Sequence, residues 1–462
     1  MCYNITVGLY SVQPFIMYKV EESHNMEKML MLGTSLASEE MIKYAQSQGV
    51  YTIVTDYLPP EKSTAKLISD EYWMINTGEL DVLETKCREE GVTAVICGVS
   101  EFNLEMSMEL CKRLGLQSYC TPEAWHYSRD KADFKKLCHE VDAPVADDYY
   151  LSDALTDEEL DKVKFPVVVK PVDMSGNRGI TYCYNKQELI DAYKYARSLS
   201  KNPKIVVERM LKGREWYSYY ALAEGTIHQI GLVAMECMPE QLKNLYSLST
   251  TVTDNVERFM AEINPKIEEV LHKVGCREGI AWVQVMLDED DHFYIIEMGY
   301  RPTGDRPEAA FPDLNGFDEI KWLVDYARGI KHKSSDLPPI QWHSYKNCCC
   351  GYSLWTHKGG TLKSFNGFEE ICNIPGIKFY TQHHVGETFP EHRPLGVVGV
   401  YADTIDEFCE KIEKINKTIS ILDENDEDVI IRYTDFDHIR ELYNNGIKQG
   451  EESSVTLGGV LE

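Results

Sequence analysis

The stretch that most constrains the fold of this chain is FPVVVKPVDMSGNRGI, residues 165–180. Its apolar first half is typical of a buried strand, and that strand delivers Lys170 to a loop containing Ser175, Gly176 and Gly179. A lysine supplies a positive charge, and a glycine-containing backbone can fold its N–H groups over an anionic ligand. The stretch therefore indicates a loop that binds phosphate.

Two common phosphate-binding motifs do not fit this stretch. It is not a P-loop, because no Gly-Lys-Ser/Thr opens a helix after the glycines. It is not a dinucleotide fingerprint, because the GxGxxG spacing is missing from it. From these residues alone, a plain glycine turn between two strands is the alternative interpretation.

Three other segments narrow the choice between a phosphate-binding loop and a plain glycine turn. SRDKADFKKL (128–137) precedes the stretch, and KIVVERMLKGREWYSYYAL (204–222) and GIAWVQVMLDEDDHFYIIEMGYR (279–301) follow it. In this order the four segments resemble the ATP-grasp superfamily of carboxylate-amine or carboxylate-thiol ligases, most closely its L-amino acid ligase branch. The resemblance runs from about Met26 to the C-terminus.

The resemblance implies which residues hold the phosphates. Lys131 and Lys170 are expected to bind the α- and β-phosphates of ATP, since a mobile ammonium group neutralises phosphate charge. Ser175 and Gly176 are expected in a lid that closes over the triphosphate. The alternative for the lysines is an ordinary solvated position, which suits Lys131, in a charged helix, better than Lys170.

The same resemblance implies how the nucleoside is bound. Glu208 and the backbone of Arg209 and Leu211 are expected at the adenine edge. Glu215 is expected on the ribose hydroxyls, because a carboxylate can pair with a diol through two hydrogen bonds. Without the resemblance, Glu215 reads as an exposed charge.

The expected metal site departs from the family pattern. Most relatives hold Mg²⁺ with an acid on the first strand of a hairpin and an E-x-N pair on the second. Here those positions are Gln284 and the triplet Glu297, Met298, Gly299. We expect Glu297 and Gln284 to hold Mg²⁺ or Mn²⁺ together with triphosphate oxygens, because Mg²⁺ readily shares its oxygen ligands with water and phosphate. A weakened or lost second metal is the alternative.

Arg301 matches the arginine that follows the E-x-N pair in the family. Its planar guanidinium suits an acyl-phosphate or a substrate carboxylate, so Arg301 and Glu297 are the expected catalytic residues. A structural ion pair is the alternative for Arg301, and it has more weight for the nearby Arg306.

Composition excludes several classes of partner. The chain has 462 residues, which suggests about three domains, and 43% of them are hydrophobic. Its 47 Lys plus Arg against 75 Asp plus Glu give a net charge of −28. A chain this acidic is repelled by nucleic acid and by anionic membranes. We therefore expect small-molecule substrates, a carboxylate and an amine, with neither nucleic acid nor membrane as a partner.

The cysteines indicate the compartment. The 14 cysteines lack CxxC spacing, and the adjacent Cys348, Cys349 and Cys350 cannot bridge one another without severe strain. The N-terminal apolar stretch is short and broken, and no run is long enough to span a membrane. We expect reduced thiols, a cytoplasmic location, and a half-buried strand at the triple cysteine.

The expected fold combines α/β and α+β parts in an ATP-grasp arrangement. Residues 26–125 alternate strand and helix, which favours an N-terminal parallel α/β domain. Residues 126–341 are expected to form a two-lobed ATP-binding unit with its lid lobe at about 145–210. Residues 342–462 read as a C-terminal α+β domain, and 1–25 as a loosely held extension.

The expected activity follows from the resemblance. It is an ATP-dependent ligase that converts a carboxylate into an acyl-phosphate, joins it to an amine such as an amino acid, and releases ADP and phosphate. Relatives are often dimers, so a homodimer is expected. The alternatives are a carbamoyl, purine-precursor or carboxylation ligase of the same superfamily, or a nucleotide-binding protein with impaired catalysis.

Overall fold

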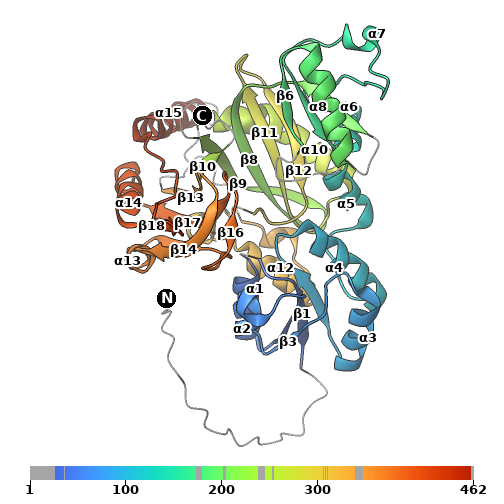
Figure 1. Ribbon diagram of the computed structural model, residues 1–462, viewed down its shortest axis with the longest axis vertical. Coiled ribbons are helices and arrows are strands. Elements are labelled where there is room, and N and C mark those ends of the chain that lie inside the picture. Colours follow the sequence, from blue (N-terminus) through green and yellow to red (C-terminus); the bar gives the residue numbers. More distant parts are fainter. Residues whose placement is uncertain are drawn as a thin grey trace, which may run out of the picture.

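The computed structural model describes residues 26–35, 37–172, 179–200, 204–237, 245–251, 254–304, 306, 309, 311–338 and 347–458. Within these ranges the protein is built from an N-terminal α/β domain, a small lid lobe, and a large antiparallel sheet that runs into the C-terminal region (Figure 1).

The N-terminal domain is the predicted parallel α/β unit. Its strands are β1 (Lys28–Leu32), β2 (Tyr51–Thr55), β3 (Glu71–Trp73) and β4 (Ala94–Cys97), in the order β3-β2-β1-β4. The helices are α1 (Ser38–Ser47), α2 (Thr64–Ile68), α3 (Leu80–Glu90) and α4 (Glu101–Leu114), with a short 3₁₀ turn at Pro60–Lys62. Gly115, at φ +72°, ends α4 as predicted, because glycine adopts the left-handed conformation without a Cβ clash.

Two helices lead from this domain to the lid lobe. They are α5 (Pro122–Arg129) and α6 (Lys131–Glu140), and α7 (Asp157–Leu160) follows. The lid lobe itself holds β5 (Val167–Pro171), β6 (Thr181–Cys183) and β7 (Ile205–Arg209), in the order β6-β5-β7, with α8 (Lys186–Leu199) packed on them. These strands and this helix lie where their sequence patterns predict them.

An eight-stranded antiparallel sheet forms the body of the molecule. Its order is β12-β11-β8-β9-β10-β13-β17-β15. The members are β8 (Gly213–Ala223), β9 (Thr226–Cys237), β10 (Tyr246–Thr250), β11 (Gly279–Asp288), β12 (Phe293–Gly299), β13 (Cys348–Trp355), β15 (Ile377–Tyr380) and β17 (Pro394–Ala402). Because β10 pairs with β13, the sheet continues across the boundary expected at residue 342.

Helices and a small second sheet surround this body. The helices are α9 (Val256–Arg258), a π-helical turn (Phe259–Ile263), α10 (Asn264–Val274), α11 (Phe311–Asn315), α12 (Glu319–Ala327), α13 (Phe368–Cys372), α14 (Ile405–Thr418) and α15 (Phe436–Gly458). A 3₁₀ turn lies at Ser334–Asp336, and β14 (Gly360–Asn366), β16 (Thr388–Phe389) and β18 (Ser420–Asp423) form the small sheet. In the described part of the chain, no helix is long and apolar enough to cross a membrane.

The triple cysteine is more buried than expected. Cys348, Cys349 and Cys350 open β13 and are at most 3% exposed. The half-buried strand predicted there is wrong, because β13 lies inside the sheet between β10 and β17 and both of its faces are covered. Burial raises the pKa of the Cys349 thiol to about 12, so this thiol stays protonated and unreactive. The cysteines in the described part of the chain are free thiols.

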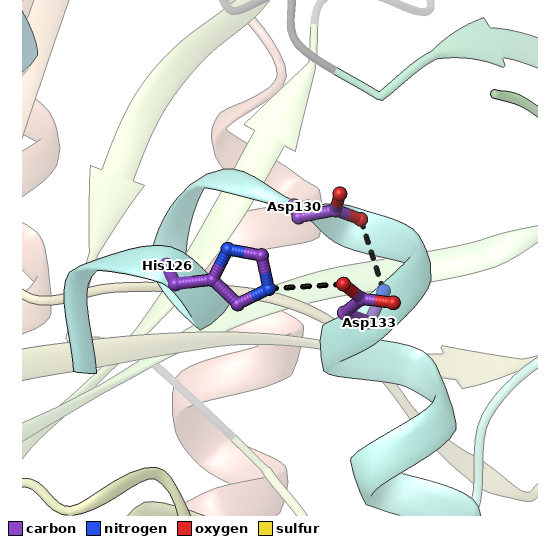
Figure 2. Close-up of side chains that lie close together, drawn as sticks. All are labelled: His126, Asp130 and Asp133. Carbon is purple, nitrogen blue, oxygen red and sulfur yellow. Dashed lines mark hydrogen bonds and ion pairs between the residues drawn. The ribbon is translucent and has the colours of Figure 1, made fainter. Parts of the chain in front are cut away.

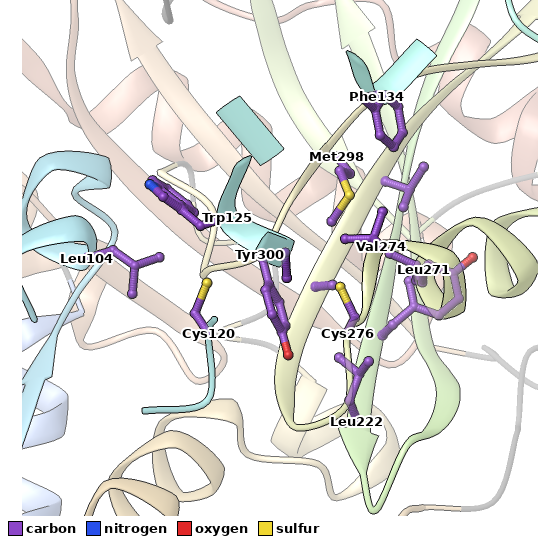
Figure 3. Close-up of a cluster of buried hydrophobic side chains, with 14 of the residues drawn as sticks. Leu104, Cys120, Trp125, Phe134, Leu222, Leu271, Val274, Cys276, Met298 and Tyr300 are labelled. Carbon is purple, nitrogen blue, oxygen red and sulfur yellow. The ribbon is translucent and has the colours of Figure 1, made fainter. Parts of the chain in front are cut away.

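One hydrophobic cluster joins the N-terminal domain to the large sheet (Figure 3). It runs from Leu104 on α4 through Trp125 and Phe134 to Met298 and Tyr300 at the end of β12. Tyr300 is fully buried, and its hydroxyl donates to the carbonyls of residues 278 (2.6 Å) and 119 (3.2 Å). Close packing of this kind leaves the end of β12 little freedom, which matters because site residues flank it.

Candidate functional site

The two predicted phosphate-binding lysines lie beside two predicted site carboxylates. Lys131, the first residue of α6, places its Nζ 2.8 Å from Oε2 of Glu297 on β12. Lys170 ends the apolar part of β5 and is ion-paired with Glu208 on the neighbouring strand β7. Burial lowers the pKa of Lys170, but the Glu208 carboxylate outweighs burial and raises it above the usual value. Lys170 is therefore fully charged at neutral pH.

The two predicted metal ligands face each other across a pair of strands. Gln284 on β11 is the direct cross-strand partner of Glu297 on β12, which brings their side chains to one face of the sheet. The Glu297 side chain is 28% exposed. Burial tends to raise its pKa, but the charges of Lys131, Lys170 and Arg301 bring the pKa below the usual value. Glu297 is thus an ionised oxygen ligand held among cations.

Glu215 lies on the same face and contacts one of the predicted metal residues, Gln284. Its carboxylate accepts a hydrogen bond from the Gln284 amide nitrogen and another from the Tyr246 side chain. Burial raises the Glu215 pKa, and these two hydrogen bonds oppose the rise. Because the nitrogen of Gln284 is used on Glu215, the amide offers its carbonyl oxygen to a cation.

The residues present fit one hard cation and leave no room for the missing asparagine. A Cβ at Gly299 meets ring atoms of Trp282 at 2.2 Å, because the two residues are direct cross-strand partners. The indole therefore fills the space of the third family ligand. One carboxylate from Glu297 and one amide oxygen from Gln284, with ligand and water oxygens, suit Mg²⁺.

Arg301 is held from both sides. Its Nη2 lies 2.9 Å from Oε1 of Glu101, at the start of α4, and its guanidinium lies 5.6 Å from the Trp282 ring centroid. Arg129 takes the other oxygen of Glu101 at 2.8 Å. Arg306 is different, because it is buried and its Nη2 binds Glu40 at 2.7 Å in a structural ion pair. An arginine that is paired yet 14% exposed can exchange partners with a substrate anion.

The remaining predicted nucleotide residues lie around the β7–β8 linker. The Arg209 backbone N–H donates to the carbonyl of residue 147 (2.9 Å), and its guanidinium stacks 4.9 Å from the ring centroid of Tyr294. Leu211 is half-buried in the linker itself. Ser175 and Gly176 lie outside the described residues, so their role in a lid stays a prediction.

One charged residue of the site was missed by the sequence argument. Lys135 is buried on α6, and its Nζ lies 2.5 Å from Oδ1 of Asp148 and 2.6 Å from Oε2 of Glu208. A signal for it was present, because Lys135 follows Lys131 by four residues and so shares a face of the helix with it. The two lysines reach different carboxylates of the site.

A small polar cluster fixes the start of α6 (Figure 2). His126 Nε2 lies 2.9 Å from Asp133, and the Asp130 side chain caps the helix by accepting from the backbone N–H groups of residues 132 and 133. These three side chains lie close enough to share a cation. Lys204 already supplies positive charge, 3.1 Å from Asp133 and 3.7 Å from Asp130. The cluster is best understood as the cap that positions Lys131.

The region that contains these residues is similar to known proteins. Residues 130–333 match the family described as carbamoyl-phosphate synthase L chain, ATP binding domain. A D-alanine–D-alanine ligase of Buchnera aphidicola subsp. Schizaphis graminum is 28% identical over 151 residues, which are 30% of this chain and 46% of that enzyme. The match thus spans less than half the length of that curated relative.

Solved structures extend the likeness over most of the chain. The L-amino acid ligase of Bacillus licheniformis superposes with a TM-score of 0.70 at 17% identity, covering 86% of this chain and 99% of that one. The biotin carboxylase domain of Hydrogenobacter thermophilus 2-oxoglutarate carboxylase, solved with MgADP, gives 0.70 at 16% identity and covers 92% and 94%. At these identities the likeness concerns the fold. The sequence match over residues 130–333 and the fold of these neighbours are both in line with the resemblance to ATP-grasp ligases.

Proposed function

We propose that the protein is an ATP-dependent ligase that activates a carboxylate as an acyl-phosphate and joins it to an amine, with release of ADP and phosphate. The observation that carries the proposal is the convergence of Lys131, Lys170 and Arg301 on Glu297, with the four residues supplied by three separate segments of the chain. Three cations around one ionised carboxylate suit the binding of a polyanion together with a divalent cation.

Each residue has a separable task in this reaction. Lys131 and Lys170 bind and orient the phosphates, for which they exchange Glu297 and Glu208 for phosphate oxygens. Arg301 orients the substrate carboxylate and neutralises the charge of the acyl-phosphate. A Mg²⁺ held by Glu297 and Gln284 would neutralise the transferred phosphoryl group. The protein contributes positioning and charge, and the amine attacks the activated carbonyl carbon.

The metal residues also support a second candidate, a nucleotide-binding protein with impaired catalysis. The observation behind it is that Trp282 fills the position of one family ligand and Gln284 replaces an acid at another. One carboxylate and one amide oxygen bind Mg²⁺ more weakly than the usual set of two carboxylates and an amide. The reaction assay described next separates the two candidates.

The test is ADP release from ATP and Mg²⁺ with pools of carboxylic acids and amines. An enzyme releases ADP only when a cognate acid is present, and an amine raises the yield by consuming the acyl-phosphate. Hydroxylamine added in place of the amine should trap that intermediate as a hydroxamate. ATP binding without acid-dependent ADP release over the whole screen would favour the second candidate.

A further inference from the structure

Glu208 is neutralised by two lysines that approach from different elements. Lys170 comes from β5 and pairs with Oε1. Lys135 comes from α6 and lies 2.6 Å from Oε2. Burial tends to raise the pKa of Glu208, but the two lysines lower it to about 2. The carboxylate is therefore ionised although it is nearly buried.

The two lysines differ in how firmly they are held. Lys135 also binds Oδ1 of Asp148 at 2.5 Å, and Asp148 forms a backbone bridge to the strand of Glu208. If Lys135 moved away, two nearly buried carboxylates would lose their shared cation, which is costly. Lys170, the penultimate residue of β5, is ion-paired with Glu208 and with no second carboxylate in the described part of the chain. In the proposed reaction Lys170 is the lysine that moves to the phosphates.

The consequence concerns Glu208 after nucleotide has bound. With Lys170 on the phosphates, Lys135 is the one cation among the described residues that stays ion-paired with Glu208. A charged carboxylate is an acceptor in all its hydrogen bonds, so it favours a purine with an amino donor at C6 over one with an oxo acceptor there. A protonated carboxyl group can donate to the 6-oxo group, and the discrimination is then lost.

We propose that Lys135, anchored by Asp148, is a positioning residue that keeps Glu208 ionised and aimed at the base, and thereby sets a preference for 6-amino over 6-oxo purine nucleotides. The inference deepens the proposed function and rests on it, since it takes ATP as the ligand and the expected position of Glu208 at the adenine edge. It adds a residue that acts through Glu208 and does not itself contact the reacting atoms.

The first experiment compares the affinities for ATP and for inosine triphosphate, which carries an oxo group at C6. In Lys135→Met, which keeps chain length but removes the charge, the ratio of the two affinities should fall about tenfold, the scale of one charged hydrogen bond. Lys135→Arg should retain most of the ratio. Lys136→Met is the matched control, because Lys136 is the exposed neighbour on the same helix.

The second experiment asks whether nucleotide binding takes up a proton. The charged and titratable groups around this site are Lys170 on β5, Lys135 and His139 on α6, and Asp148 with Tyr150 on the segment beside β7. In Lys135→Met the departure of Lys170 raises the pKa of Glu208, so ATP binding should be coupled to proton uptake and tighten as pH falls from 8 towards 5. Titration calorimetry in buffers of different ionisation enthalpy measures this uptake.

Two results would overturn the inference. The first is an unchanged affinity ratio in Lys135→Met, which includes an equal loss of affinity for both nucleotides. The second is proton uptake like that of the parent, and either result leaves Lys135 a structural role at most. If Lys135→Met does not fold, Asp148→Asn replaces it and should show the same changes to a smaller extent. Failure of the parent protein to bind ATP would overturn the proposed function, whereas ATP binding with an unaltered ratio in the variants overturns only this inference.

Discussion

At the scale of single residues, the cations of the site are ion-paired with carboxylates. Lys131 is paired with Glu297, and Arg301 is paired with Glu101. Lys170 is paired with Glu208. Binding of an anionic substrate is therefore an exchange of partners, in which each cation leaves one carboxylate for a phosphate or a substrate oxygen. The net gain of each exchange is smaller than that of a contact with an unpaired lysine.

The first prediction concerns Lys170. Lys170→Ala should weaken ATP binding by about 1.5–3 kcal/mol, the usual range for a hydrogen bond to a charged group. Lys164→Ala is the control, because Lys164 is an exposed lysine of the same lobe. Calorimetric titration measures both, and an unchanged ATP affinity in Lys170→Ala would mean that Lys170 does not bind the phosphates.

The second prediction concerns the metal residues. Glu297→Gln should remove most ADP-forming activity because the site then has no charged ligand. Gln284→Glu places two carboxylates face to face, since residues 284 and 297 are cross-strand partners. That variant should be less stable without Mg²⁺ and regain stability when Mg²⁺ is added. Its activity should reach saturation at a lower Mg²⁺ concentration than that of the parent. Thermal unfolding and ADP release against Mg²⁺ concentration test both variants. If Glu297→Gln keeps the parent's Mg²⁺ curve, the metal binds elsewhere.

The third prediction follows from the contact between Gly299 and Trp282. Gly299→Asn alone should lower the free energy of unfolding by about 1–3 kcal/mol, because the new side chain overlaps the indole. In a Trp282→Ala background the same substitution should cost much less, since the space is free. Urea unfolding of the four proteins in this double-mutant cycle gives the coupling energy. Equal costs in both backgrounds would show that the ring does not exclude the asparagine.

Sequence patterns predicted the site residues unevenly, for a physical reason. Lys170 was predicted because a strand delivers it to a glycine-containing loop, and Glu297 because its segment resembles the ATP-grasp pattern. Lys135 and Trp282 were not predicted, since their importance depends on the groups they meet: Asp148 and Glu208 for Lys135, and Gly299 for Trp282. Contacts between distant segments leave little trace in local residue patterns.

At the scale of elements, periodic segments with clear end signals were predictable. The alternation of strand and helix in residues 26–125 was predicted from such signals and is confirmed. The join between β10 and β13 was not predicted. It brings Thr250 within hydrogen-bond distance of the carbonyl of Cys349, 99 residues away, and no local pattern specifies such a pairing.

The fourth prediction concerns the junction of α6, β5 and β7, where Glu208 meets two lysines. The folded-state pKa of Glu208, about 2, lies below the unfolded value of 4.5. Its contribution to stability is therefore complete above about pH 4.5 and is lost as pH falls towards 2. The difference corresponds to about 3 kcal/mol as an upper figure. Glu208→Gln should unfold with a flatter pH dependence in that window, whereas Glu158→Gln, at an exposed site in the lid lobe, should follow the parent.

At the scale of the whole molecule, the N-terminal domain reaches the proposed reaction centre through one side chain. Glu101 begins α4, and its two oxygens bind Arg301 and Arg129. The hydrophobic cluster that includes Leu104 and Tyr300 fixes both sides of this contact. The N-terminal domain was expected to contribute one wall of the site. Through Glu101 it also orients a residue that is expected to bind the substrate carboxylate.

The last prediction tests this connection between domains. Glu101→Gln keeps the size of the side chain but removes the charge that holds Arg301, so Arg301 should sample more orientations and turnover should fall about tenfold, the scale of one charge-assisted hydrogen bond. ATP affinity should stay at the parent value, because the ion pairs of Glu101 within the described residues run to the two arginines and to neither phosphate-binding lysine. Glu105→Gln, one helical turn further along α4 and exposed, is the control. ADP release gives turnover and calorimetry gives ATP affinity. Parent-like turnover in Glu101→Gln would show that Arg301 is positioned from its own strand and by Trp282 alone, and a loss of ATP affinity would show that the N-terminal domain acts on the nucleotide instead of on the carboxylate.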